Sequence, residues 1–93
     1  MLPEPGGDLA IAAALVSSLR DRPISSGTLV LGEVGLAGEV RAVGQLDQRL
    51  AEAAQLGFSL CVLPEGNRAR AVGAPLKLRG VANVGEAIDA LFA

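Results

Sequence analysis

The apolar positions of residues 8–20 recur at helical spacing. Asp8, at the start of the repeat, is a residue type that caps helix N-termini. Arg20, at its end, is a cation where the helix dipole favours one. The positions between them are also apolar, Ile11 and Ala14 among them. The repeat therefore predicts a helix that is buried on more than one face.

Two later stretches also have helical periodicity. Residues 46–56 place apolar side chains on one face and polar ones on the other, and Gly57 follows, a residue common just beyond a helix C-terminus. Residues 84–92 repeat in the same way, with Glu86 in the first turn, where an acid is favourable. Both stretches predict amphipathic helices.

Strand patterns lie between these two helices. Residues 58–63 form a short apolar run that Pro64 breaks, which predicts a buried strand. Residues 76–79 alternate apolar and charged side chains, as an edge or half-buried strand does. Residues 65–73 are polar and loop-like, with room for one helical turn.

A glycine-rich segment, residues 31–41, has apolar residues before and after it. Its glycines recur every third position, at Gly32, Gly35 and Gly38. The pattern predicts a hairpin whose first strand includes residues 29–31 and whose second begins near Val40. No lysine, Ser/Thr or helix start follows the glycines, so a phosphate-binding loop is not expected.

The predicted order is helix, hairpin, helix, strand, strand, helix. Strand–helix–strand units are typical of an α/β fold or α+β sandwich, here with helices packed on a small mixed sheet. The length of 93 residues predicts a single domain, residues 1–93.

The formal net charge is −2, so the composition does not mark a polyanion-binding protein. One run is basic, however. Between Gly66 and Asn83 there is no acid, and the four bases are Arg68, Arg70, Lys77 and Arg79. A solvated loop and strand edge would account for this run. A nucleic-acid contact surface is the alternative.

Residue types exclude most catalytic sites. The chain has no His, no Tyr and one Lys, so Ser-His and Cys-His arrangements and zinc-binding clusters are excluded within it. A Ser-Lys dyad would have to use Lys77, where a solvated side chain is the simpler interpretation.

Cys61, the one cysteine, lies in an apolar run and is predicted to be buried and unreactive. A chain with no disulfide fits a cytoplasmic location. No apolar run reaches the roughly 18 residues of a membrane span.

Three blocks in order resemble the C-terminal domain of the RadA (Sms) family of bacterial DNA-repair and recombination ATPases. They are PGGDLA at residues 5–10, LGEVGLAGEVR at residues 31–41, and RLAEAAQLGF at residues 49–58. The resemblance runs from about Glu4 to Phe92. That domain is similar to the proteolytic domain of Lon protease.

The Lon pattern places a catalytic Ser after a proline, just before the first helix, and a catalytic Lys early in the second helix. In this sequence these positions fall at Gly6 and Asp47. Glycine has no nucleophilic oxygen, and aspartate cannot replace the amine as base. Arg49 is effectively always protonated. The resemblance therefore implies a retained fold and a lost peptidase site.

The resemblance also implies a role. A longer RadA-like parent protein would assemble into a homo-oligomeric ring, bind DNA and process branched DNA intermediates, with this domain as a non-catalytic assembly module. No cofactor is expected in this chain, because ATP, Mg and Zn would belong to other domains of the parent. The opening strands of the Lon-like domain are expected to be missing. Two alternatives stay open: a Lon-type peptidase with displaced catalytic residues, and a free-standing interaction domain of the same fold.

Overall fold

The computed structural model describes residues 7–71 and 73–92. Helices and strands follow the predicted order, except for one additional strand before the hairpin and one short helix before the last strand. The elements are α1 (Asp8–Arg20), β1 (Thr28–Val30), β2 (Glu33–Val34), β3 (Val40–Arg41), α2 (Leu46–Gln55), β4 (Leu60–Pro64), α3 (Glu65–Arg68), β5 (Lys77–Val81) and α4 (Val84–Phe92).

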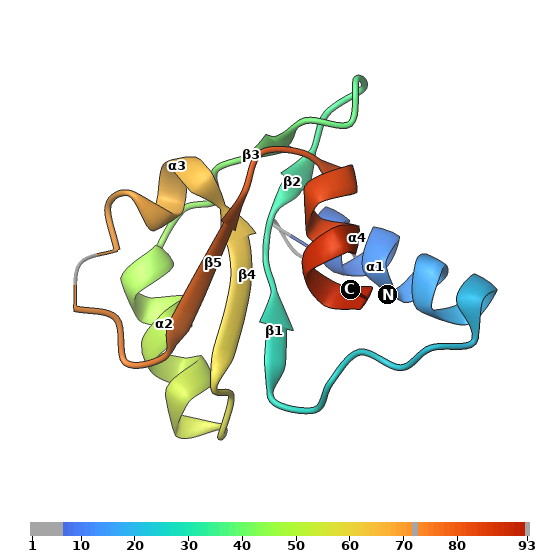
Figure 1. Cartoon of the computed structure of the whole chain (residues 1–93). Coiled ribbons are helices and arrows are strands. Elements are labelled where there is room, and N and C mark those ends of the chain that lie inside the picture. The colour runs from blue at the N-terminus through green and yellow to red at the C-terminus, as the bar shows by residue number, and fades with distance from the viewer. Residues whose placement is uncertain (1–6, 72, 93) are drawn as a thin grey trace.

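Strands β1, β4 and β5 form a sheet in the order β1–β4–β5, and both pairs are parallel. Helices α1 and α4 cover one face, and α2 and α3 cover the other (Figure 1). Side chains alternate between the faces, as a strand requires. Cys61 packs with Leu50 of α2, whereas the next residue, Val62, packs with Leu9 of α1 and Ala87 of α4. The predicted α/β fold is confirmed.

Strands β2 and β3 form a separate antiparallel pair. Its paired residues are Glu33 with Arg41 and Val34 with Val40. The N–H of Val40 also donates to the carbonyl of Ala82 at 2.8 Å, which ties the pair to the end of β5. The prediction that residues 29–31 form the first arm of a hairpin was wrong. Leu29 and Val30 belong to β1 of the larger sheet, and Leu31 follows it. The first arm of the hairpin is β2, which starts only after Gly32.

Gly32 is where the chain passes from β1 to β2. Its φ is +154°, and a Cβ there would lie 2.8 Å from Cγ1 of Val40 and 3.2 Å from Cδ2 of Leu9. Its carbonyl accepts a hydrogen bond from the N–H of Leu9 at 2.9 Å. A glycine is therefore needed here for close approach of α1 and β3.

Helix α1 begins one residue earlier than the sequence predicts. Its N-cap is Gly7, and Asp8 is the first helical residue. The Asp8 carboxylate instead accepts a hydrogen bond from the N–H of Val34 at 3.3 Å. Asp8 is thus used to bind β2 to the start of α1.

The prediction that this helix is buried on more than one face was also wrong. Leu9 and Ala13 are fully buried, but three large apolar side chains of α1 are not. They are Ile11 (54% exposed), Leu15 (61%) and Leu19 (87%). Spaced four residues apart, they form one stripe, here called the α1 ridge. The sheet and α4 cover only the opposite side of the helix.

Several smaller predictions can be compared with the structure. The one helical turn after the fourth strand is present as α3. Strand β4 runs through Pro64 rather than ending before it. This is tolerated because the nitrogen of Pro64 faces β1, which has already ended at Val30.

Cys61 is fully buried as predicted, and burial raises the pKa of its thiol to about 12. Within the described residues, no helix is long and apolar enough to cross a membrane.

Candidate functional site

A loop of residues 43–45 positions the start of α2, where the resemblance places the lost catalytic lysine. Gln45 has a φ of +55°, unusual for a residue with a side chain. The buried side chain of Asn67 holds the loop. Its Oδ1 accepts from the N–H of Val43 at 2.7 Å, and its Nδ2 donates to the carbonyl of the same residue at 2.9 Å. One amide thus pairs with both backbone groups of Val43.

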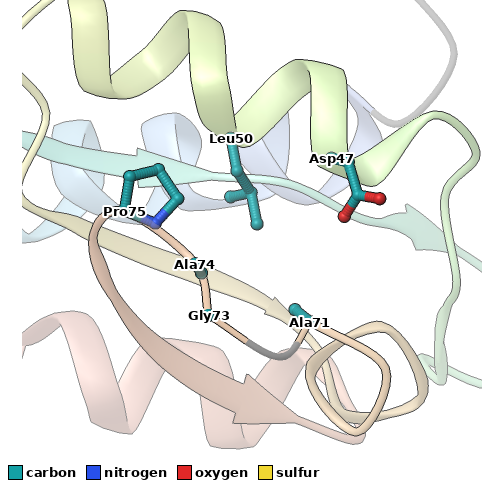
Figure 2. A pocket seen from close by; sticks show the side chains of 6 residues that line it. All are labelled: Asp47, Leu50, Ala71, Gly73, Ala74 and Pro75. Carbon is teal, nitrogen blue, oxygen red and sulfur yellow. The ribbon is translucent and has the colours of Figure 1, made fainter.

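Asp47 lies in the first turn of α2 and borders two concavities. The first, of about 270 Å³, lies between α2 and the loop before β5. Figure 2 shows Asp47 and Leu50 projecting from α2 toward that loop. Its lining residues are Asp47, Leu50, Ala71, Gly73, Ala74 and Pro75. The second, of about 500 Å³, is bordered by the 43–48 segment together with Asn67 and Arg70.

Among the described residues, the linings of the two concavities lack the nucleophile and base of a Ser-Lys or Cys-His peptidase. Their linings include no Ser, Thr, Cys, Lys or His among the described residues. In the first, Asp47 is the one ionisable side chain among those residues. No group of three or more potential metal ligands occurs in the described part of the chain. The Gly6 position lies outside the described residues, so its geometry relative to Asp47 is not defined.

The alternative Ser-Lys dyad would require the Lys77 amine to reach a serine hydroxyl. The nearest link is between backbones, where the N–H of Lys77 donates to the carbonyl of Ser59 at 3.0 Å. The Ser59 hydroxyl turns the other way, toward the carbonyl of Gly27 at 3.5 Å. Lys77 is exposed, and within residues 7–71 and 73–92 its side chain has no hydrogen bond to a serine. Ser59 and Lys77 do line one open concavity of about 520 Å³, but the described residues show no hydrogen bond between their side chains.

The four basic residues of the predicted contact surface do not gather on one face. Arg68 forms an ion pair with Glu65 at 3.4 Å, and both side chains lie over Gly80 on the α3 face of β5. Side chains alternate along β5, and Lys77 and Arg79 are an odd number of residues from Gly80. They therefore project from the opposite face of that strand. Arg70 borders the concavity beside Asp47. The four basic residues therefore lie on both sides of the edge strand β5 and do not form one continuous patch.

Two features of the structure, the pairing of Asn67 with Val43 and the exposure of the α1 ridge, could not be predicted from the sequence. Asn67 lies in a stretch with no periodicity, so its buried pairing with Val43 could not be read from its neighbours. The α1 ridge was visible as apolar spacing, but spacing does not tell whether anything covers the side chains.

The sequence matches a known protein family over nearly its whole length. Residues 3–91 match the C-terminal proteolytic domain of Lon protease, family S16. The chain belongs to this family. A Lon-like domain also agrees with the helices packed on both faces of the small sheet.

Comparison with individual curated proteins narrows the similarity to DNA repair proteins named RadA. The chain is 46% identical over 89 residues to the DNA repair protein RadA of Pseudomonas aeruginosa, a match to 96% of this chain and 20% of that protein. It is 44% identical over 90 residues to RadA of Bacillus subtilis (94% and 19%). It is 41% identical over 86 residues to RadA of Escherichia coli (92% and 19%).

These similarities confirm the predicted resemblance to the Lon-like domain of RadA. The chain spans about one fifth of the length of these relatives.

Proposed function

We propose that the chain is a non-catalytic assembly domain of a RadA-type DNA repair protein, and that it associates with other copies through the α1 ridge. The observation that carries this proposal is the ridge itself. Three large aliphatic side chains follow one side of a 13-residue helix and are 54–87% exposed. Contiguous exposed apolar surface of this kind marks interaction sites.

The residue types at the two Lon catalytic positions support a non-catalytic role. Gly6 and Asp47 stand where the Lon pattern has its Ser and Lys, and Lys77 gives no replacement. Hydrolysis of ATP, binding of Mg and Zn, and processing of branched DNA in recombination would then belong to other parts of a longer cytoplasmic protein. In that protein, this domain would help to form a homo-oligomeric ring.

The first experiment is the mass of the chain in solution, by sedimentation equilibrium or light scattering over a concentration series. The helix is about 20 Å long at roughly 1.5 Å per residue. An interface this short falls below the roughly 800 Å² per partner of a standard stable contact. We therefore expect weak association, with a Kd of about 0.1–1 mM, equivalent to roughly 4–5.5 kcal/mol.

Leu15→Glu should weaken this association about tenfold or more, because it places a charge at the centre of the ridge. Leu36→Glu is the matched control, since Leu36 is fully exposed on the β2–β3 loop and is not part of the ridge. A wild-type chain that stays monomeric up to about 1 mM, or a Leu15→Glu chain that associates like the wild type, would overturn the proposal.

A DNA contact is the second part of the proposed function. Within the described residues, Arg70, Lys77 and Arg79 are exposed and in no ion pair, whereas Arg68 is held by Glu65. Only Lys77 and Arg79 share a face of β5, so alanine at all four positions should lower the salt slope of binding to a branched oligonucleotide by about two, at roughly 0.9 per phosphate contact. Arg41→Ala, on the distant hairpin, is the control. An unchanged slope would remove DNA contact from the proposal.

A further inference from the structure

Strand β5 forms one edge of the larger sheet, and among the described residues no strand pairs with its outer side (Figure 1). Its five residues pair in parallel with β4 along their whole length. The N–H of Lys77 donates to the carbonyl of Ser59 at 3.0 Å, so the backbone groups of Lys77 are directed to β4. This direction alternates from residue to residue along a strand. The N–H and carbonyl groups of Leu78 and Gly80 therefore point outward, away from β4.

These outward backbone groups are open to a further partner. Within residues 7–71 and 73–92, neither Leu78 nor Gly80 uses its N–H or carbonyl in a hydrogen bond on this side. Both residues are only half-buried. The open stretch ends at Ala82, whose carbonyl accepts a hydrogen bond from the N–H of Val40 at 2.8 Å. An unpaired strand edge of this kind is a template for main-chain pairing with another extended segment.

The side chains that alternate with these groups are basic. Lys77 and Arg79 are exposed, and both project from the same face of β5. Among the described residues, neither forms an ion pair with Glu86 or Asp89, the two acids of α4. The Glu86 carboxylate instead accepts a hydrogen bond from the N–H of Ala82 at 3.1 Å. The edge therefore presents two positive charges beside its open backbone groups.

These charges decide which kind of segment can pair with the edge. If β5 of a second copy were added antiparallel, with Leu78 opposite Leu78, then Lys77 of each copy would face Arg79 of the other. Like charges directly opposite one another are destabilising, and charged edge strands commonly prevent such self-pairing. A carboxylate opposite each basic residue would instead form a favourable cross-strand pair. The edge is therefore suited to an acidic segment of a different protein and not to a second copy.

We infer that the outer edge of β5 binds an extended acidic segment of a partner protein as an added antiparallel strand, with carboxylates opposite Lys77 and Arg79. Because the backbone groups of these two residues are directed to β4, they would occupy non-hydrogen-bonded positions of the new antiparallel pair, where opposed side chains lie closest. Leu78 and Gly80 would exchange hydrogen bonds with the residues that alternate with the acids. The inference does not depend on self-association through the α1 ridge.

Main-chain pairing is tested first, by fluorescence anisotropy of a short, fluorescein-labelled peptide that alternates glutamate and valine. Two N-methylated forms of this peptide keep its charge. In the inferred strand the valine N–H groups face β5, and the glutamate N–H groups face solvent. Methylation of the valine nitrogens should therefore weaken binding about tenfold or more, whereas methylation of the glutamate nitrogens should change it by less than about twofold. Equal binding of the two forms would mean that charge alone holds the peptide, as it would hold a nucleic acid, and would overturn the inference.

Charge reversal of the edge is the second test. The double variant Lys77→Glu and Arg79→Glu should lose the glutamate–valine peptide and gain binding of a lysine–valine peptide, because opposite charges again face one another. A folding defect cannot produce this exchange of specificity. Arg41→Glu, on the hairpin, is the control and should bind like the wild type. Unchanged binding of the glutamate–valine peptide to the double variant, or no binding to the wild type up to about 1 mM, would overturn the inference.

Discussion

The side-chain amide of Asn67 takes the place of two backbone hydrogen-bond partners for Val43. The loop before α2 is not part of a sheet, so Val43 would otherwise have an unpaired N–H and carbonyl in a buried position. Val43 is 8% exposed and Asn67 only 6%. Asn67 therefore fixes the loop that presents Asp47.

Asn67→Ala should reduce the free energy of unfolding by about 2–4 kcal/mol, because two buried polar groups lose their partners. Urea denaturation followed by circular dichroism measures this directly. Asn67→Asp keeps an acceptor for the Val43 N–H but loses the donor and buries a charge, so it should not rescue stability. A loss below about 0.5 kcal/mol for Asn67→Ala would mean that water replaces the amide.

At the scale of elements, local patterns and distant pairings differ in what the sequence reveals. Helices α2 and α4 were predicted because their amphipathic repeats are local. The role of β1 was not, because its partner is β4, and Thr28 pairs with Leu60 far along the chain. Apolar spacing located α1 but could not show that its outer side lacks a cover. Asp47 was singled out only through the family resemblance, since one aspartate at a helix start has no distinctive pattern.

Gly32→Ala tests the junction of three elements, α1, β1 and β3. The added methyl would meet Val40 at 2.8 Å and Leu9 at 3.2 Å, at a φ of +154°. We expect a loss of about 1–3 kcal/mol from overpacking, with backbone strain in addition. Gly44→Ala is the control, because nothing lies within 4 Å of the place its methyl would take and its φ is not positive. Equal melting temperatures for the two variants would show that the junction yields without cost.

At the scale of the whole molecule, the two clusters on either side of the sheet unfold together if the domain is cooperative. Cys61 reports on this, because it is fully buried in the middle strand. Burial raises the pKa of its thiol from 9.0 to about 12. Above pH 9 the unfolded chain loses this proton while the folded chain keeps it, so stability falls as pH rises.

The loss should approach about 1.4 kcal/mol per pH unit between pH 9 and pH 12. No tyrosine titrates in this chain to obscure it. Denaturant midpoints at several pH values from about 8 to about 11 provide the measurement. Cys61→Ala has no thiol, so its midpoint should change less over the same range. If the denaturant midpoints of the two proteins fall in parallel as pH rises, the Cys61 thiol ionises in the folded chain without a loss of stability.

The parallel pairing of β1 with β4 also has a consequence during synthesis. β1 leaves the ribosome well before β4 exists, at the usual rate of roughly 5–20 residues per second. For that interval, the nascent chain has one strand with no neighbour and the future α1 with no sheet beneath it. Both sides of α1 are then open to solvent, the side that the sheet will cover and the side that stays uncovered. The emerging segment therefore offers more hydrophobic surface to chaperones and to neighbouring nascent chains than the finished domain ever does.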